Sequence, residues 1–259
     1  MTGDNEPYSV GLMMEFTNTL KTWRHARRFS QLQLATEADI SARHLSFLES
    51  GRAKPSREMI GKLSDALQLP LDARNVMLTH AGFAVRYEGR QWDDEQMQPI
   101  QKAIDRLLET HMPFPCLVLD RYWTILKAND AAASFFGVLG AGVGVSILDL
   151  MMSDTLPPLV ENWPEVAHHT AVRLRTESLA LGGDERLDAV VAHLSKVEGV
   201  TSQTTAPVIP ITLRLGELRL SMFSTLSQFG TPEDVSLDSY KIEHYFPMDA
   251  QTEAFFNPS

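Results

Sequence analysis

A short basic stretch, SARHLSFLESGRAKPSR at residues 41–57, holds the side chains best suited to a chemical role. Nine Lys/Arg and four Asp/Glu lie between Lys21 and Lys62, whereas the whole chain has net charge −10. An arginine such as Arg43 can donate two hydrogen bonds to guanine O6 and N7, a fit that neither lysine nor a neutral side chain reproduces. The charge asymmetry therefore indicates nucleic-acid contact in one half of the chain.

A helix over residues 42–50 divides this stretch into two faces. At 100° per residue, Leu45 and Leu48 fall on the core side. We expect base contacts from the opposite side, through Ala42, Arg43, Ser46 and Phe47. An exposed Phe47 would require a partner, and it could contact a thymine methyl. We expect phosphate contacts from Gln31, Ser41, His44, Arg52, Lys54 and Arg57.

The elements that must position these residues are short helices. Apolar periodicity predicts helices at about 12–28, 31–38, 42–50, 57–67 and 71–81. Ser30 and Ser41 are suited to cap the second and third helices, and Gly51 to end the third. The prediction is an all-α domain of five helices at 10–83, after a flexible tail at 1–9 and before a linker at 84–95.

The second half, 96–259, has the pattern of an α+β domain. A helix is predicted at 96–109, followed by strands at 116–119 and 123–126 and by a short helix capped by Asn129 or Asp130. Two helices at 158–181 and 184–197 precede strands at 208–215, 217–226 and 236–247, with Gly216-Glu217 as a hairpin turn. These elements predict an antiparallel sheet with helices beside it.

Several other chemistries lack support in the sequence. The single cysteine, Cys116, excludes an intrachain disulfide and fits a reducing cytoplasm, and we expect no signal peptide and no membrane span. The glycine-rich stretch at 137–145 lacks GxGxxG and a P-loop lysine. His168 and His169 are adjacent and cannot both face one metal from a regular helix. We expect no metal and no enzymatic activity, although an enzyme site with dispersed residues in the second half stays an alternative.

Residues 30–67 resemble the helix-turn-helix of Cro and phage repressors (XRE type, lambda-repressor-like). More narrowly, RHLSFLESGRAKPSREM at 43–59 and LPLDARNVMLTHAGFA at 69–84 resemble the MmyB-like transcription regulators. The resemblance implies a homodimer on a palindromic operator in double-stranded DNA, and an ion pair between Arg24 and Glu49. Asp39 stands where the broad family often has glycine; aspartate tolerates the left-handed conformation that this turn needs.

The segment PCLVLDRYWTILKANDAAASFFG at 115–137 resembles the opening of a PAS domain, and MmyB-like regulators carry a PAS-like ligand-binding domain after the helix-turn-helix. The resemblance implies a small apolar ligand, with a fatty acid as the first candidate. We expect its pocket to include Trp123, Phe135, Phe136 and Met222, with Arg173, Arg175, His193 and Tyr240 as possible anchors. The chain is thus expected to be a cytoplasmic, sequence-specific DNA-binding regulator; a helix-turn-helix that acts as a protein–protein adaptor is the other alternative.

Overall fold

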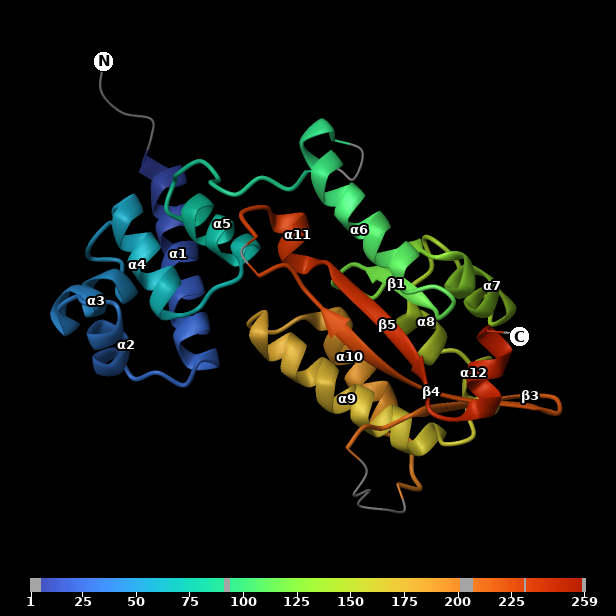
Figure 1. Cartoon of the computed structure of the whole chain (residues 1–259). Helices are drawn as coiled ribbons and strands as arrows, with labels where there is room; N and C mark the ends of the chain where they lie inside the picture. Colours follow the sequence, from blue (N-terminus) through green and yellow to red (C-terminus); the bar gives the residue numbers. More distant parts are fainter. Residues whose placement is uncertain (1–5, 91–93, 201–206, 231, 258–259) are drawn as a thin grey trace. The chain divides into compact units, whose positions relative to one another are not determined.

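The computed structural model of the chain describes residues 6–90, 94–200, 207–230 and 232–257, with no account of the side chains of residues 6–10 (Figure 1). The chain divides into two compact units. The first consists of the chain up to Gly89 together with Ser178–Asp184 and Glu233–Val235, and the second holds the remainder. The sequence predicted neither of these two short segments as part of the first unit. Among the described residues, no helix combines the length and apolar character needed to cross a membrane.

The first unit is built from the predicted series of short helices. They are α1 (Glu6–Ala26), α2 (Gln31–Glu37), α3 (Ala42–Glu49), α4 (Arg57–Ala66) and α5 (Leu71–His80). Helix α1 begins at Glu6, so residues 6–9 of the expected tail are helical, while 1–5 lie outside the described residues. All five helices contribute to one apolar core, whose fully buried side chains include Phe16, Leu20, Leu34, Leu45, Leu48, Ile60, Leu63 and Met77.

Local hydrogen bonds explain where these helices begin. The side chain of Ser30 accepts a hydrogen bond from Gln33 N and forms a reciprocal capping box with the Gln33 side chain. Ser41 caps α3 in the same way by accepting from His44 N. Gly51 follows α3 with φ +70°, and Asp39 in the turn before it has φ +51°, as the sequence predicted for both.

Part of the expected linker is held against α5. The Asn75 side chain accepts hydrogen bonds from the backbone N–H groups of Arg86 and Tyr87, and it donates to the Tyr87 carbonyl at 2.6 Å. Tyr87 is buried as a result. Residues 84–90 carry no helix or strand, but 86–87 are fixed to the first unit by Asn75.

A five-stranded antiparallel sheet organises the second unit, with strand order β2-β1-β5-β4-β3. Its strands are β1 (Cys116–Leu119), β2 (Ile125–Ala128), β3 (Ile211–Leu215), β4 (Leu218–Ser227) and β5 (Lys241–Pro247). Leu215 pairs with Leu218 across the predicted Gly216-Glu217 hairpin turn. The α+β class with an antiparallel sheet is confirmed.

Helices cover the two faces of this sheet differently. Helix α6 (Gln98–Thr110), which follows a 3₁₀ turn at Glu95–Met97, packs Ile104 and Leu108 against Cys116, Val118 and Ile242. Because side chains alternate along a strand, Glu243 and Tyr245 of β5 point to the other face. That face adjoins α7 (Asp130–Val138), α8 (Ile147–Met151) and α9 (Trp163–Ala180), which line a cavity described below. The remaining described helical segments are the 3₁₀ turn Pro157–Leu159, α10 (Glu185–Leu194), α11 (Val235–Ser239) and α12 (Ala250–Phe256).

The second unit differs from the prediction in several details. Trp123 belongs to the turn before β2 with φ +57°, because the Asp120 side chain accepts hydrogen bonds from Tyr122 N and Thr124 N and tightens the turn. Residues 236–239, expected in a strand, are helical in α11. Helix α8 was not predicted. Asn129, rather than Asp130, caps α7 by accepting from Ala132 N.

Candidate nucleic-acid interface and ligand cavity

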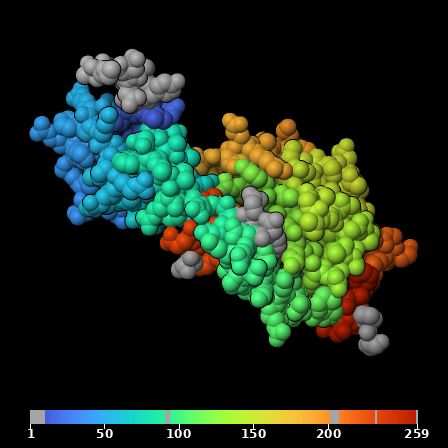
Figure 2. Space-filling model, turned by 90° about the horizontal axis from the view of Figure 1, so that it is seen from above, coloured from blue at the N-terminus to red at the C-terminus, as the bar shows by residue number. Residues whose placement is uncertain are grey.

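Helix α3 presents the predicted face to solvent. Ala42 and Arg43 are exposed, Ser46 and Phe47 are half-buried, and Leu45 is fully buried in the core. The blue spheres of this part of the chain form an outer edge of the first unit in Figure 2. The base-contacting residues proposed from the sequence therefore share one accessible face, and their contacts with DNA stay a prediction.

Phe47 differs from the expectation of an exposed ring. The guanidinium carbon of Arg43 lies 5.3 Å from the centre of the Phe47 ring, a cation–π arrangement within α3. The ring is half-buried and lies beside Arg43, so Phe47 already has a partner in the free protein. This contact limits the rotamers of Arg43, the side chain proposed to read guanine.

Glu49 is a structural residue. Its carboxylate accepts from Arg24 Nε at 2.6 Å and from Arg24 Nη2 at 3.1 Å, and Glu49 is only 2% exposed. Burial by itself raises the pKa of Glu49, but hydrogen bonds from Arg24 and Gln31 and the charge of Arg24 lower it overall. The predicted Arg24–Glu49 pair is confirmed, and it fixes the end of α3 to α1.

The proposed phosphate-binding residues fall into two groups. Ser41, Arg52 and Lys54 are exposed and His44 is half-buried, and none of these four forms an ion pair with another described residue. Two others have partners within the unit: Gln31 Nε2 donates to Glu49 Oε2 at 2.7 Å, and Arg57 Nη2 donates to the Ala84 carbonyl at 3.2 Å. One amide hydrogen of Gln31 is therefore committed to Glu49, since a carboxylate is the stronger acceptor.

A groove beside α3 adds residues that sequence reasoning did not assign. It lies between α1 and the loop after α3, and it is lined by Lys21, Asn18, Arg52 and Lys54 among others. Lys21 is in the basic region of the sequence, but only the packing of α1 on α3 places it beside Arg52. The groove thus gathers three cations of the basic region beside α3, and their contact with phosphate stays a prediction.

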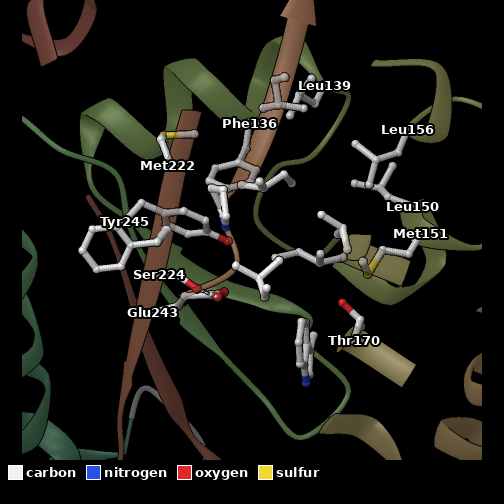
Figure 3. A pocket seen from close by; sticks show the side chains of 18 of the residues that line it. Phe136, Leu139, Leu150, Met151, Leu156, Thr170, Met222, Ser224, Glu243 and Tyr245 are labelled. Carbon is white, nitrogen blue, oxygen red and sulfur yellow. Dashed lines mark hydrogen bonds between the residues drawn. The ribbon is translucent and has the colours of Figure 1, made fainter. Parts of the chain in front are cut away.

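The second unit contains an apolar cavity of about 210 Å³ between the sheet and α7, α8 and α9 (Figure 3). This volume is below the range of about 300–1,000 Å³ that is typical of drug-sized ligands. The cavity therefore favours a small occupant. Its apolar lining includes Phe136, Leu139, Leu150, Met151, Leu156 and Met222.

The structure gathers five of the eight predicted pocket residues around this cavity. They are Trp123, Phe135, Phe136, Arg173 and Met222. The other three do not line it: Arg175 is exposed on α9, His193 is exposed on α10, and Tyr240 is buried just before β5. Arg175 lies two positions from Arg173 on α9, and a helix turns by about 200° over two residues, so the two side chains face opposite ways.

A charged network borders the polar end of the cavity. Lys241 Nζ lies 2.5 Å from Glu177 Oε2, and Arg173 Nε donates to Glu177 Oε1 at 3.0 Å. The Arg173 guanidinium also lies 4.2 Å from the centre of the Trp123 ring. Burial lowers the pKa of Lys241, although its carboxylate partner Glu177 acts in the opposite direction. Burial raises the pKa of Glu177, but the neighbouring Lys241 and Arg173 lower the pKa of Glu177 overall.

Sequence reasoning missed the acidic member of the lining, Glu243. Its Oε1 accepts from the Ser224 hydroxyl at 2.7 Å, and both residues point toward the cavity with Tyr245 (Figure 3). The available signal was the alternation of Lys241, Glu243 and Tyr245 along β5, which puts polar groups on one face of a strand inside an apolar domain. The alternation did not show which face of β5 would be covered by helices. In the described part of the chain, no cluster of His, Cys, Asp or Glu has the arrangement of a metal site.

Two family models match this chain. The MmyB-like transcription regulator ligand binding domain matches residues 100–257, and a helix-turn-helix family matches residues 20–73. The chain belongs to the MmyB-like transcription regulators. This MmyB-like protein thus combines a DNA-binding helix-turn-helix with a ligand-binding domain, as the sequence resemblance predicted.

Solved structures give weaker similarities to this MmyB-like regulator. The PAS domain of BvgS from Bordetella pertussis is similar at 12% identity and TM-score 0.30, over 62% of this chain and 94% of that one. An RNA-binding light-oxygen-voltage receptor is similar at 11% identity and TM-score 0.28, over 99% of this chain and 67% of that one. A search among curated proteins found no match.

Proposed function

We propose that this regulator acts in the cytoplasm as a homodimer on a palindromic operator and that a small apolar ligand in the cavity changes its operator affinity. The observation that carries the DNA-binding part is the face of α3. Arg43 is exposed there, stacked on Phe47, while the buried Arg24–Glu49 pair holds the helix from behind. A pre-positioned arginine at the start of a helix suits the major groove, where N-terminal residues of a recognition helix contact base edges.

The ligand-sensing part rests on the cavity. Its apolar walls suit an alkyl chain, and Arg173 supplies a cation at its edge. A fatty acid is the first candidate, with its carboxylate near Arg173. Because half-sites lie about 34 Å apart, one turn of B-DNA, a small change in dimer geometry would disengage one recognition helix. No catalytic step is part of this proposal.

The DNA-binding proposal is tested by selecting bound duplexes from a random pool with the full chain. We expect an inverted repeat, bound with an affinity that falls steeply as salt rises. Arg43→Ala should weaken the selected site by about 1–3 kcal/mol and relax the preference at one position in each half-site. Arg175→Ala removes an exposed arginine of the second unit and serves as the matched control.

The alternative functions predict different results. A protein–protein adaptor would select no sequence, and Arg43→Ala would leave its weak duplex binding unchanged. An enzyme domain would convert a bound acyl compound, whereas a sensor would release the compound chemically unchanged. Mass spectrometry of the released compound distinguishes the two. Sedimentation of the protein with the selected duplex would reveal whether one or two chains bind each site.

A further inference from the structure

Phe47 is an aromatic residue of α3 that the core of the first unit does not use. Leu45 and Leu48 are fully buried, whereas the Phe47 ring is half-buried and lies opposite Leu45, since two residues turn a helix by about 200°. Among the described residues, the partly buried apolar side chains packed on this core include Ile40 and Ala53 but not Phe47. Packing within the unit therefore does not explain an aromatic residue here.

The backbone of Phe47 is fixed at the end of α3. Its carbonyl accepts hydrogen bonds from Arg52 N at 2.8 Å, from Ala53 N at 3.3 Å and from the Ser50 hydroxyl at 3.3 Å. A helical side chain points toward the turn that precedes its own Cα, so the Phe47 ring reaches Arg43, four positions earlier. The ring is thus held on the exposed face of α3 next to the Arg43 guanidinium.

The guanidinium of Arg43 contacts this ring and leaves its N–H groups unused. Its central carbon lies 5.3 Å from the ring centre, and Arg43 forms no ion pair or side-chain hydrogen bond with another described residue. By contrast, Arg24 donates to a carboxylate and Arg57 to a backbone carbonyl. Because a cation–π contact uses the flat face of a guanidinium, the N–H groups at its edge stay available for guanine O6 and N7.

The distance between the two side chains matches two neighbouring base pairs. Successive base pairs are about 3.4 Å apart, so a ring centred 5.3 Å from a guanidinium that binds guanine lies beside the adjacent pair. The apolar group that a base pair presents in the major groove is the C5 methyl of thymine. An aromatic ring can cover that methyl and still contact Arg43.

We infer that Arg43 and Phe47 read two adjacent base pairs as one unit. Arg43 donates two hydrogen bonds to a guanine, while Phe47 covers the C5 methyl of a thymine in the next pair and holds Arg43 in place. Phe47 is thus a specificity-determining residue and a positioning residue for Arg43. The inference rests on the proposed operator binding and adds what the operator must contain, a guanine next to a thymine in each half-site.

The test replaces each thymine of the selected duplex, one at a time, by deoxyuridine, which removes the C5 methyl alone. Fluorescence anisotropy measures binding of the full chain. Next to the guanine whose preference Arg43→Ala relaxes, we expect one thymine per half-site at which deoxyuridine weakens binding about fourfold. In Phe47→Ala the same replacement should have no effect. Absence of such a thymine, or a methyl effect that persists in Phe47→Ala, would overturn the inference.

Ala42 is the other side chain of this face that can cover a thymine methyl, because it is exposed and apolar. We expect the deoxyuridine effect to persist in Ala42→Gly. Loss of the effect in Ala42→Gly but not in Phe47→Ala would assign the methyl contact to Ala42 and overturn the inference.

The positioning role is tested by the preference for guanine over adenine at the Arg43 position. Phe47→Leu keeps an apolar side chain but removes the ring, so the preference should fall about two- to fivefold; Phe47→Tyr keeps the ring and should retain the preference. Phe83→Leu is the matched control, since the Phe83 ring lies 5.4 Å from the Arg57 guanidinium and a phosphate contact carries no sequence information. Equal losses in Phe47→Leu and Phe83→Leu would contradict the positioning role.

The selection of duplexes separates this inference from the function on which it rests. If the full chain selects no sequence, the proposed operator binding fails and the inference fails with it. If an inverted repeat is selected but every deoxyuridine duplex binds as tightly as its thymine counterpart, operator binding stands and the inference alone fails.

Discussion

Arg24 and Glu49 form a buried bidentate ion pair that joins α1 to the last residue of α3, with 2.6 Å between Arg24 Nε and Glu49 Oε1. The same arginine donates from Nη1 to the Phe29 carbonyl at 2.8 Å, so it also holds the chain segment that leads into α2. One side chain thus fixes both helices of the helix-turn-helix to the core.

Arg24→Ala should destabilise the first unit by about 3–5 kcal/mol, because it leaves the Glu49 carboxylate buried without its counter-charge. The double variant Arg24→Met with Glu49→Leu should cost less than Arg24→Ala alone, since no orphaned charge remains. Urea unfolding followed by circular dichroism measures both. Arg52→Ala, at an exposed position, is the control and should stay within about 0.5 kcal/mol. A double variant as unstable as Arg24→Ala would show that the charge is not the cause.

The same pair predicts how stability depends on pH. The pKa of Glu49 is lowered in the folded state from an ordinary value of 4.5. The contribution of Glu49 is therefore complete above that value and is lost as pH falls through the lower folded pKa. Between pH 5 and pH 3, the wild type should lose more stability than Glu49→Gln, which carries no titrating group there. Parallel pH profiles of the two proteins would contradict this assignment.

Arg52 and Lys54 are predicted to contact phosphate without reading sequence. Replacing either by alanine should weaken all duplexes by a similar factor and reduce the slope of log K against log salt by about 1. Fluorescence anisotropy over a salt series, with the selected operator and a scrambled duplex, measures this. A loss confined to the operator would instead indicate base contact.

Cys116 should be unreactive in the folded protein. Burial, with a smaller contribution from the Glu243 carboxylate, raises the pKa of its thiol to about 12, so the reactive thiolate is scarce at pH 8. Thiol-reactive dyes should label it only after unfolding in urea. Labelling of the native protein at the rate of a free thiol would show that β1 opens readily.

The sequence by itself determined the local elements and the nature of the first unit. Capping serines, apolar periodicity and turn residues such as Asp39 act over a few positions, so the helices and turns that they form can be predicted before the fold is known. The motif around α3 predicted both its exposed face and, through family resemblance, the Arg24–Glu49 pair. The stacking of Arg43 on Phe47 is also local, but the rotamers that create it could not be foreseen from spacing.

Only the tertiary structure decided which residues line the cavity. Arg173 on α9 and Glu243 on β5 are 70 positions apart, and nothing in their sequence neighbourhoods relates one to the other. Arg175 and His193 looked equally suitable as anchors, but the rotation of α9 and α10 turns both outward. Which of several polar residues ends up buried depends on how a helix packs against a sheet, and that packing is the sum of many distant contacts rather than a property of any short segment.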